Sequence, residues 1–247
     1  MRVISIFICV FLCGSLSEAC AEDITPSFSQ KLDIQVRYDN RSNRPSREQY
    51  RLRYYPSLAL TSTWSVNSFI VTGDDFSSSH NTFGSDTTDY LYARRLYLRH
   101  ESNAGKTELG IIPTYKGRVS STGLSKDGWI TGIRHVRKLQ NNTALEIVVG
   151  QLANAEASEA FNVGEEDEYF EIEYSAKMGE RHSYEASFER MLNGTFARAE
   201  YRFRINEEDT AFVELVQRTD ESAAKIVVGT SGEFTMNAFN TAYPVEY

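Results

Sequence analysis

The sequence predicts an all-β protein built from antiparallel strands, and two patterns lead to this prediction. Apolar and polar residues alternate with a period of two along most of the chain, which places them on opposite faces of a strand. The helical pattern, with apolar residues at positions i, i+3, i+4 and i+7, is almost missing. Stretches rich in Asn, Gly, Asp and Ser, the residues that tight turns favour, separate the alternating segments.

The composition is that of a folded protein. The chain has 247 residues, of which 41% are hydrophobic and 24% charged, and this balance excludes a disordered or collagen-like chain. The formal net charge is −8. A nucleic-acid-binding protein normally presents a positive field, so we expect no nucleic-acid partner.

The first 21 residues have the features of an export signal. Arg2 is followed by an apolar run over residues 3–16 and then by Ala19-Cys20-Ala21, a small-x-small cleavage pattern. We therefore expect residues 1–21 to be a signal peptide and residues 22–247 to be the mature domain. All three cysteines lie in this leader, so the mature chain forms neither a disulfide nor a thiolate metal site. A lipoprotein anchor at Cys20 is the weaker alternative, because Glu18 places a charge in the lipobox.

The strands follow from the alternation. In residues 29–38, Leu32, Ile34 and Val36 share one face, opposite Lys31 and Asp33. The same division into an apolar and a charged face recurs along the chain. In order, the expected strands are residues 29–38, 50–60, 64–71, 90–100, 106–115, 129–139, 145–151, 170–178, 184–192, 197–205, 211–218 and 223–230, with a thirteenth candidate at the C-terminus.

The connections fall into two classes. Short ones are expected at residues 62–63, 102–105, 140–142, 179–181 and 206–209, and long ones at 39–48, 74–88, 116–126 and 154–167. Through the first eight strands, long and short connections alternate strictly. This alternation predicts that the long loops lie at one end of the sheet and the short turns at the other.

A soluble β-sandwich and a transmembrane barrel both show period-two alternation, and three observations favour the barrel. An export signal precedes a chain without disulfides, loop length alternates by side, and aromatic residues stand at the ends of the apolar faces. These residues are Tyr50, Tyr90, Tyr92, Tyr115, Trp129 and Tyr184. Closure would also satisfy every backbone hydrogen bond in the hydrocarbon core. We expect a transmembrane antiparallel β-barrel of about 12 strands, since closure with both termini on one side needs an even number. Membership in a larger barrel stays open.

Several segments carry a resemblance to a known class. Residues 49–53, 64–66 and 71–75 are similar to the early hairpin of many porins, and Phe239, Tyr243, Val245 and the terminal Tyr247 resemble a final barrel strand ending in an aromatic residue. Pro244 departs from that pattern. The chain thus resembles a Gram-negative outer-membrane β-barrel of the small porin-like kind. The resemblance implies an outer-membrane location, contact with membrane lipids and passive transport of ions or small hydrophilic solutes.

In a barrel, the charged face must point into the lumen, because an Arg or Lys facing lipid at mid-membrane costs roughly 2–4 kcal/mol. Walls of charge in a wet lumen select among ions and small solutes. The expected pore-lining residues are Arg37, Arg51, Arg53, Arg95, Arg99, Glu171, Glu173, Glu185, Glu189, Arg198, Arg202 and Arg204. In a ring of about 12 strands, the strand with Arg51 lies opposite the strand with Glu171.

Two other functions compete with the channel. His100 and Ser102 resemble the His-x-Ser-Asn element of outer-membrane lipid esterases, but the same residues are typical of a hairpin turn. The second alternative is an exported soluble β-sheet binding protein. We expect no metal site, because the four histidines are scattered and the acidic runs at 165–168 and 207–209 lack the pattern of a calcium loop. We also expect no cofactor and no catalytic residue, and the sequence leaves the oligomeric state open.

Overall fold

The computed structural model describes residues 26–41, 44–73, 79–84, 91–114, 127–152, 156–162, 168–191, 194–238 and 241–246. The expected signal peptide lies outside these residues. None of the described residues forms a helix with the length and hydrophobicity that crossing a membrane would take. The described chain is almost entirely antiparallel β-sheet, which confirms the predicted fold class.

Twelve consecutive strands form the sheet, each paired antiparallel with the next. They are β1 (Ser27–Arg41), β2 (Arg44–Ala59), β3 (Trp64–Thr72), β5 (Leu91–Ser102), β6 (Gly105–Pro113), β7 (Trp129–Lys138), β8 (Thr143–Gln151), β9 (Tyr169–Met178), β10 (His182–Met191), β11 (Gly194–Arg204), β12 (Thr210–Arg218) and β13 (Ala223–Ser231). Each corresponds to one of the segments expected from the alternation, and the turns between β2 and β3, β5 and β6, β7 and β8, β9 and β10, and β11 and β12 are all short.

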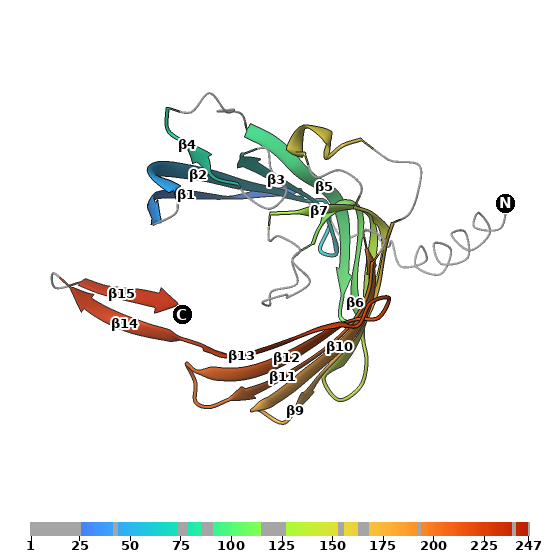
Figure 1. The fold of residues 1–247 in the computed structure, drawn as a ribbon. Coiled ribbons are helices and arrows are strands. Elements are labelled where there is room, and N and C mark those ends of the chain that lie inside the picture. Colours follow the sequence, from blue (N-terminus) through green and yellow to red (C-terminus); the bar gives the residue numbers. More distant parts are fainter. Residues whose placement is uncertain are drawn as a thin grey trace.

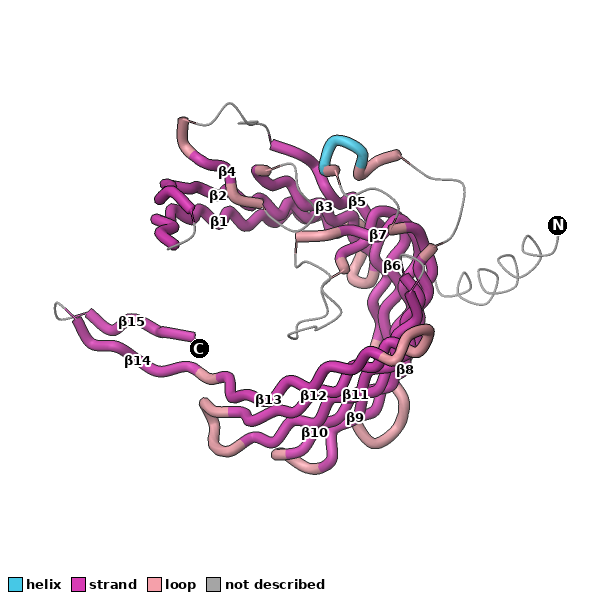
Figure 2. Tube along the Cα trace, viewed as in Figure 1, coloured by secondary structure: helices cyan, strands magenta, loops and turns pink. Residues whose placement is uncertain are grey.

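The sheet curls into a C (Figures 1 and 2). Strands β1 to β3 form one arm, β5 to β8 form the bend, and β9 to β13 form the other arm. Among the described residues, no ladder joins β1 to β13. Because twelve strands alternate in direction, these two edges run antiparallel to each other, which is the orientation that an antiparallel barrel needs for closure.

One expectation about the connections is wrong. The long loop expected at residues 39–48 does not exist, because β1 and β2 stay paired as far as Arg41 and Arg44. Asp39 and Arg47, opposite each other in this register, form an ion pair at 3.0 Å that stabilises the extension. Polar residues in this stretch imitate a loop although they continue a strand.

The C-terminal strand also differs from the expectation. After Gly232 the chain continues as β14 (Glu233–Ala238), and β15 (Thr241–Glu246) pairs with β14 rather than with the sheet. This hairpin is a separate two-stranded sheet. Residues 239 and 247, part of the expected final-strand pattern, lie outside the described residues.

The other long connections contain short ordered elements. Strand β4 (Asn81–Thr82) pairs with β2, beyond the point where β3 ends. The 3-10 helix η3 (Ala157–Glu159) lies between β8 and β9, where Ala157 packs with Ile111 and Trp129 in one buried cluster. The described parts of these connections therefore pack onto the strands near one end of the sheet.

A row of glycines runs across the bend. Gly110, Gly132 and Gly150 are direct partners on β6, β7 and β8, and the row is flanked by Tyr97 on β5 and Tyr169 on β9. A Cβ atom built on Gly132 would lie 2.1 Å from a carbonyl oxygen of β8. Glycine in strand interiors permits such close approach and marks sharp bends in sheets. This row explains why the sheet bends at β6 to β8.

Candidate functional site

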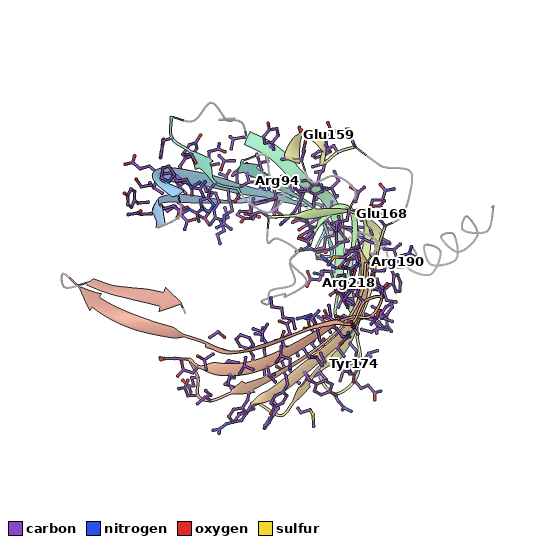
Figure 3. The ribbon with its side chains drawn as sticks, in the orientation of Figure 1. Arg94, Glu159, Glu168, Tyr174, Arg190 and Arg218 are labelled. Carbon is purple, nitrogen blue, oxygen red and sulfur yellow. The ribbon has the colours of Figure 1, made fainter. Side chains whose placement is uncertain are left out.

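The two faces of the sheet are inverted relative to a soluble protein. On β9, Glu171 and Glu173 are 0% and 7% exposed, whereas Phe170 and Ile172 are 39% and 37% exposed. Strands β10 and β12 repeat this pattern. Soluble proteins bury apolar residues and almost never bury unpaired carboxylates. Side chains stand on both faces of the curved sheet, and Tyr174 in Figure 3 belongs to the exposed apolar face of β9.

A group of arginines, here called the arginine cluster, lies on the first arm and on the adjoining strand of the bend: Arg51 and Arg53 on β2 and Arg95 on β5. Residues 51 and 53 share one face of their strand. Asp127, which precedes β7, lies between them: its carboxylate is 3.7 Å from a terminal nitrogen of Arg51 and 3.7 Å from one of Arg53. The Arg95 Nε donates to the carbonyl oxygen of Gly128 at 2.8 Å. The chain before β7 is therefore held against β2 and β5.

Ser79 and His80, which precede β4, lie beside the arginine cluster. The Ser79 hydroxyl donates to Asp127 Oδ2 at 2.5 Å. His80, in the same connection, contacts Gln35 at 3.1 Å. Burial together with the charges of Arg51 and Arg37 lowers the pKa of His80 to about 4. His80 is therefore neutral at pH 7 and adds no charge to the cluster.

The bend carries a charge network in which acidic and basic residues are interleaved. Arg134 on β7 donates to Glu108 on β6 at 2.8 Å and to Glu146 on β8 at 2.9 Å. Glu108 also pairs with Arg99 at 2.7 Å and with Lys106 at 3.3 Å. The network thus joins three cations to two carboxylates and keeps one net positive charge.

The second arm carries the acidic cluster, centred on Arg198 of β11. Arg198 Nη1 lies 2.5 Å from Glu185, Nη2 lies 2.9 Å from Glu200, and Nε contacts Glu214. Glu173 lies 3.9 Å from the same guanidinium. Arg202 adds a second cation through Glu200. Four carboxylates around Arg198 leave this arm with an excess of negative charge.

Two further carboxylates extend the acidic cluster. Glu171 and Glu189 are direct cross-strand partners, and the Tyr169 hydroxyl lies 2.8 Å from each. A tyrosine hydroxyl has a single proton to donate, so it can hydrogen-bond one of the two carboxylates at a time. The charge excess of the second arm therefore continues along β9 and β10.

All but one of the expected lumen-facing residues have partly or fully buried side chains. The structure brings together Arg51, Arg53 and Arg95 in one cluster, and Arg198 with Glu173 and Glu185 in the other. Glu171 and Glu189 meet through a tyrosine, Arg37 donates to Gln49 at 2.9 Å, and Arg99 pairs on the bend. Arg204 is exposed at the end of β11, away from the acidic cluster.

Sequence reasoning missed five charged residues that complete these groups: Glu108, Asp127, Arg134, Glu200 and Glu214. Four of them are buried on strands, each beside an exposed apolar residue, so stricter alternation counting would have found them. Asp127 precedes its strand and carries no periodic signal.

An apolar group also lies on the face that carries the buried charges. Ile112, Ile130, Val148, Tyr169 and Met191 form one buried cluster, with Tyr97 and Phe196 packed against it. Val148 and Glu171 are cross-strand partners, so the two kinds of residue share one face. The face that carries the buried charges is therefore partly apolar across the bend.

The structure adds little support for an esterase site at His100 and Ser102 or for a metal site. The His100 ring packs against Trp64, with 4.6 Å between ring centroids, and Ser102 is the last residue of β5 before the turn to β6. In the described part of the chain, no group of histidines and acidic residues is arranged to hold a metal ion.

An up-and-down antiparallel sheet with a charged inner face and an apolar outer face defines the porin-like class of β-barrel folds. Solved structures share this fold. A triple mutant of Rhodopseudomonas blastica porin aligns with a TM-score of 0.55 and 9% identity, covering 85% of this chain and 80% of that chain. Another mutant of Rh. blastica porin aligns with a TM-score of 0.53 and 10% identity over the same shares. No family model and no curated protein matches the sequence. The likeness establishes the porin-type fold.

Proposed function

We propose that this protein is a passive channel of the outer membrane, through which ions or small hydrophilic solutes diffuse along a charged lumen. The inverted faces carry this proposal: charged side chains are buried on one face while Leu, Ile, Val and Phe are exposed on the other. In water, the apolar face would be a continuous exposed patch. Against lipid, the same face needs no cover, and the charges on the other face keep a lumen wet.

We also propose roles in the channel for the other parts of the chain. Residues 1–21 would direct export, and residues 22–247 would form the barrel. The twelve residues expected from the sequence to line the pore would do so together with Asp127 and Glu214. The connecting loops on the side of η3 and β4 would face the outside, since outer loops of such barrels are the longer ones. No catalytic role is assigned to His100 or Ser102.

Conductance in a planar bilayer is the decisive test. Residues 22–247 are refolded in detergent and added to a bilayer separating two KCl solutions, where stepwise increases in current are expected. Heat-dependent mobility on gels is the control for folding. A folded protein that stays monodisperse without detergent and gives no current would contradict the channel and favour the soluble binding protein.

A further inference from the structure

The arginine cluster has hydrogen-bond donors that its present partners do not use. The Nε atoms of Arg51 and Arg53 are buried, and neither has a hydrogen-bond partner among the described residues. Both guanidinium groups lie 3.7 Å from Asp127, which is longer than a charge-assisted hydrogen bond of about 2.7–2.9 Å. Asp127 therefore neutralises part of the charge without satisfying the donors.

The position of Asp127 is fixed by other contacts. Its Oδ2 accepts from the Ser79 hydroxyl at 2.5 Å, and the next residue, Gly128, is held by Arg95 at 2.8 Å. These contacts keep the carboxylate between Arg51 and Arg53 but too far away for bidentate pairing. The planar guanidinium groups therefore keep donors that an anion with more oxygen atoms could accept.

The balance of charges around the arginine cluster also favours the binding of an anion. Arg37, Arg51, Arg53 and Arg95 stand on this part of the face. Within the part of the chain that the structure describes, the carboxylates that pair with Arg51 and Arg53 are Asp127 and Asp33, the latter 3.2 Å from Arg53. His80 stays neutral because its pKa is lowered to about 4. An unbalanced positive charge in a partly desolvated place attracts anions more strongly than it would in bulk water.

We infer that Arg51, Arg53 and the Ser79 hydroxyl form a binding subsite for small oxyanions, and that Asp127 occupies it when no solute is bound. Phosphate and carboxylate groups share the required chemistry, because their oxygens accept paired N–H bonds from guanidinium groups. A bound oxyanion would take the hydroxyl of Ser79 and the unused donors of the two arginines, and Asp127 would yield its place. The inference rests on the proposed channel and adds the class of solute.

The subsite is tested with inorganic phosphate on the refolded channel. At constant KCl, rising phosphate should reduce the chloride current with a saturable dependence, since an occupied subsite slows chloride passage. The double variant Arg51→Gln with Arg53→Gln should weaken this block at least about tenfold, because charge-assisted hydrogen bonds are lost. Succinate in a parallel series distinguishes carboxylate from phosphate preference.

The variant Asp127→Asn tests whether the Asp127 carboxylate opposes phosphate binding at the subsite. It removes the competing carboxylate, so phosphate should block more tightly, by about tenfold if the competition is worth one charge-assisted bond. The matched control is Arg218→Gln, which removes an arginine of the other arm that pairs with Asp220 at 3.0 Å. This control should keep the wild-type phosphate dependence.

The outcomes distinguish the two proposals. A conducting channel with no saturable block by either anion, or a block that Asp127→Asn weakens, would overturn the oxyanion subsite and leave the channel intact. If the wild-type protein does not conduct, the channel proposal fails. The subsite is then decided by calorimetric titration of the refolded protein with phosphate: binding that the double arginine variant loses supports it, and no binding by the wild type overturns it.

Discussion

The two arms of the sheet use the same face of the same kind of strand for opposite charges. On the acidic arm, Arg198 is surrounded at close range by Glu185, Glu200 and Glu214. On the basic arm, Arg51 and Arg53 stand 3.7 Å from their shared counter-ion. In the first arrangement, Arg198 pairs with carboxylates of its own and the neighbouring strands, and these ion pairs hold the strands together. The second keeps its donors for another partner, which is why we assign solute binding to that arm.

The largest effect is expected from removing the cation of the acidic arm. Arg198→Met would leave four carboxylates close together in a buried place, and breaking a buried ion pair from one side costs about 3–5 kcal/mol. Assembly into membranes or micelles should fail or require far less urea to reverse. Arg202→Met, whose partner Glu200 also pairs with Arg198, should cost clearly less. Equal losses would mean that Arg198 is not the centre of the cluster.

The next effect tests the faces themselves. Ile172→Asp, on the exposed apolar face, should impair folding into lipid by up to about 2 kcal/mol. Ser175→Asn, on the opposite face, should be tolerated; Asn is used there because an added carboxylate would lie opposite Glu185. The measurement is the urea midpoint of refolding into liposomes for both variants. Similar midpoints would show that the facing of β9 is assigned incorrectly.

The bend between the arms gives a stability effect of similar size. Gly132→Ala would place a methyl group 2.1 Å from a carbonyl oxygen, and overpacking of this kind costs about 1–3 kcal/mol. Gly194→Ala is the matched control, because the added methyl would meet the movable Phe196 ring at 2.9 Å instead of backbone. The thermal midpoint in detergent should fall more for the first variant. The reverse order would refute the role given to the glycine row.

The opposed charges of the two arms should appear in ion selectivity without much change in stability. Arg51→Gln with Arg53→Gln should shift the zero-current potential toward cation selectivity, and Glu171→Gln with Glu173→Gln toward anion selectivity. The potential is measured under a KCl gradient at low ionic strength, where screening is weak. Shifts in the same direction, or no shift, would show that these residues do not line a shared pore.

The smallest effect is expected outside both arms. Ser102→Ala and His100→Ala should leave conductance and selectivity unchanged, because Ser102 borders a turn and His100 packs on Trp64. Bilayer conductance is measured for the wild type and both variants, and a lipid-release assay on the same proteins tests the esterase. Hydrolysis that both substitutions abolish, with folding preserved, would support the esterase interpretation instead.

The strands and their faces were readable from the sequence alone. Alternation such as Phe170, Ile172 and Tyr174 against Glu171 and Glu173 is a local property, since successive side chains of a strand point to opposite sides whatever the partner strand is. The arginines of β2 and the glutamates of β9 were found in this way. The extension of β1 and β2 past Asp39 was missed, because its polar residues resemble a loop.

Only the tertiary structure decided which charges meet. Arg198 finds Glu185 and Glu214 through the registers of β10 to β12, and Asp127 reaches Arg51 and Arg53 across more than seventy positions of sequence. Register and curvature arise from pairing between distant segments and from the glycine row, and no local pattern encodes them. The alternation determined that this chain has a charged face. Folding decided that one arm gathers its carboxylates around Arg198 while the other leaves the Nε donors of Arg51 and Arg53 without partners.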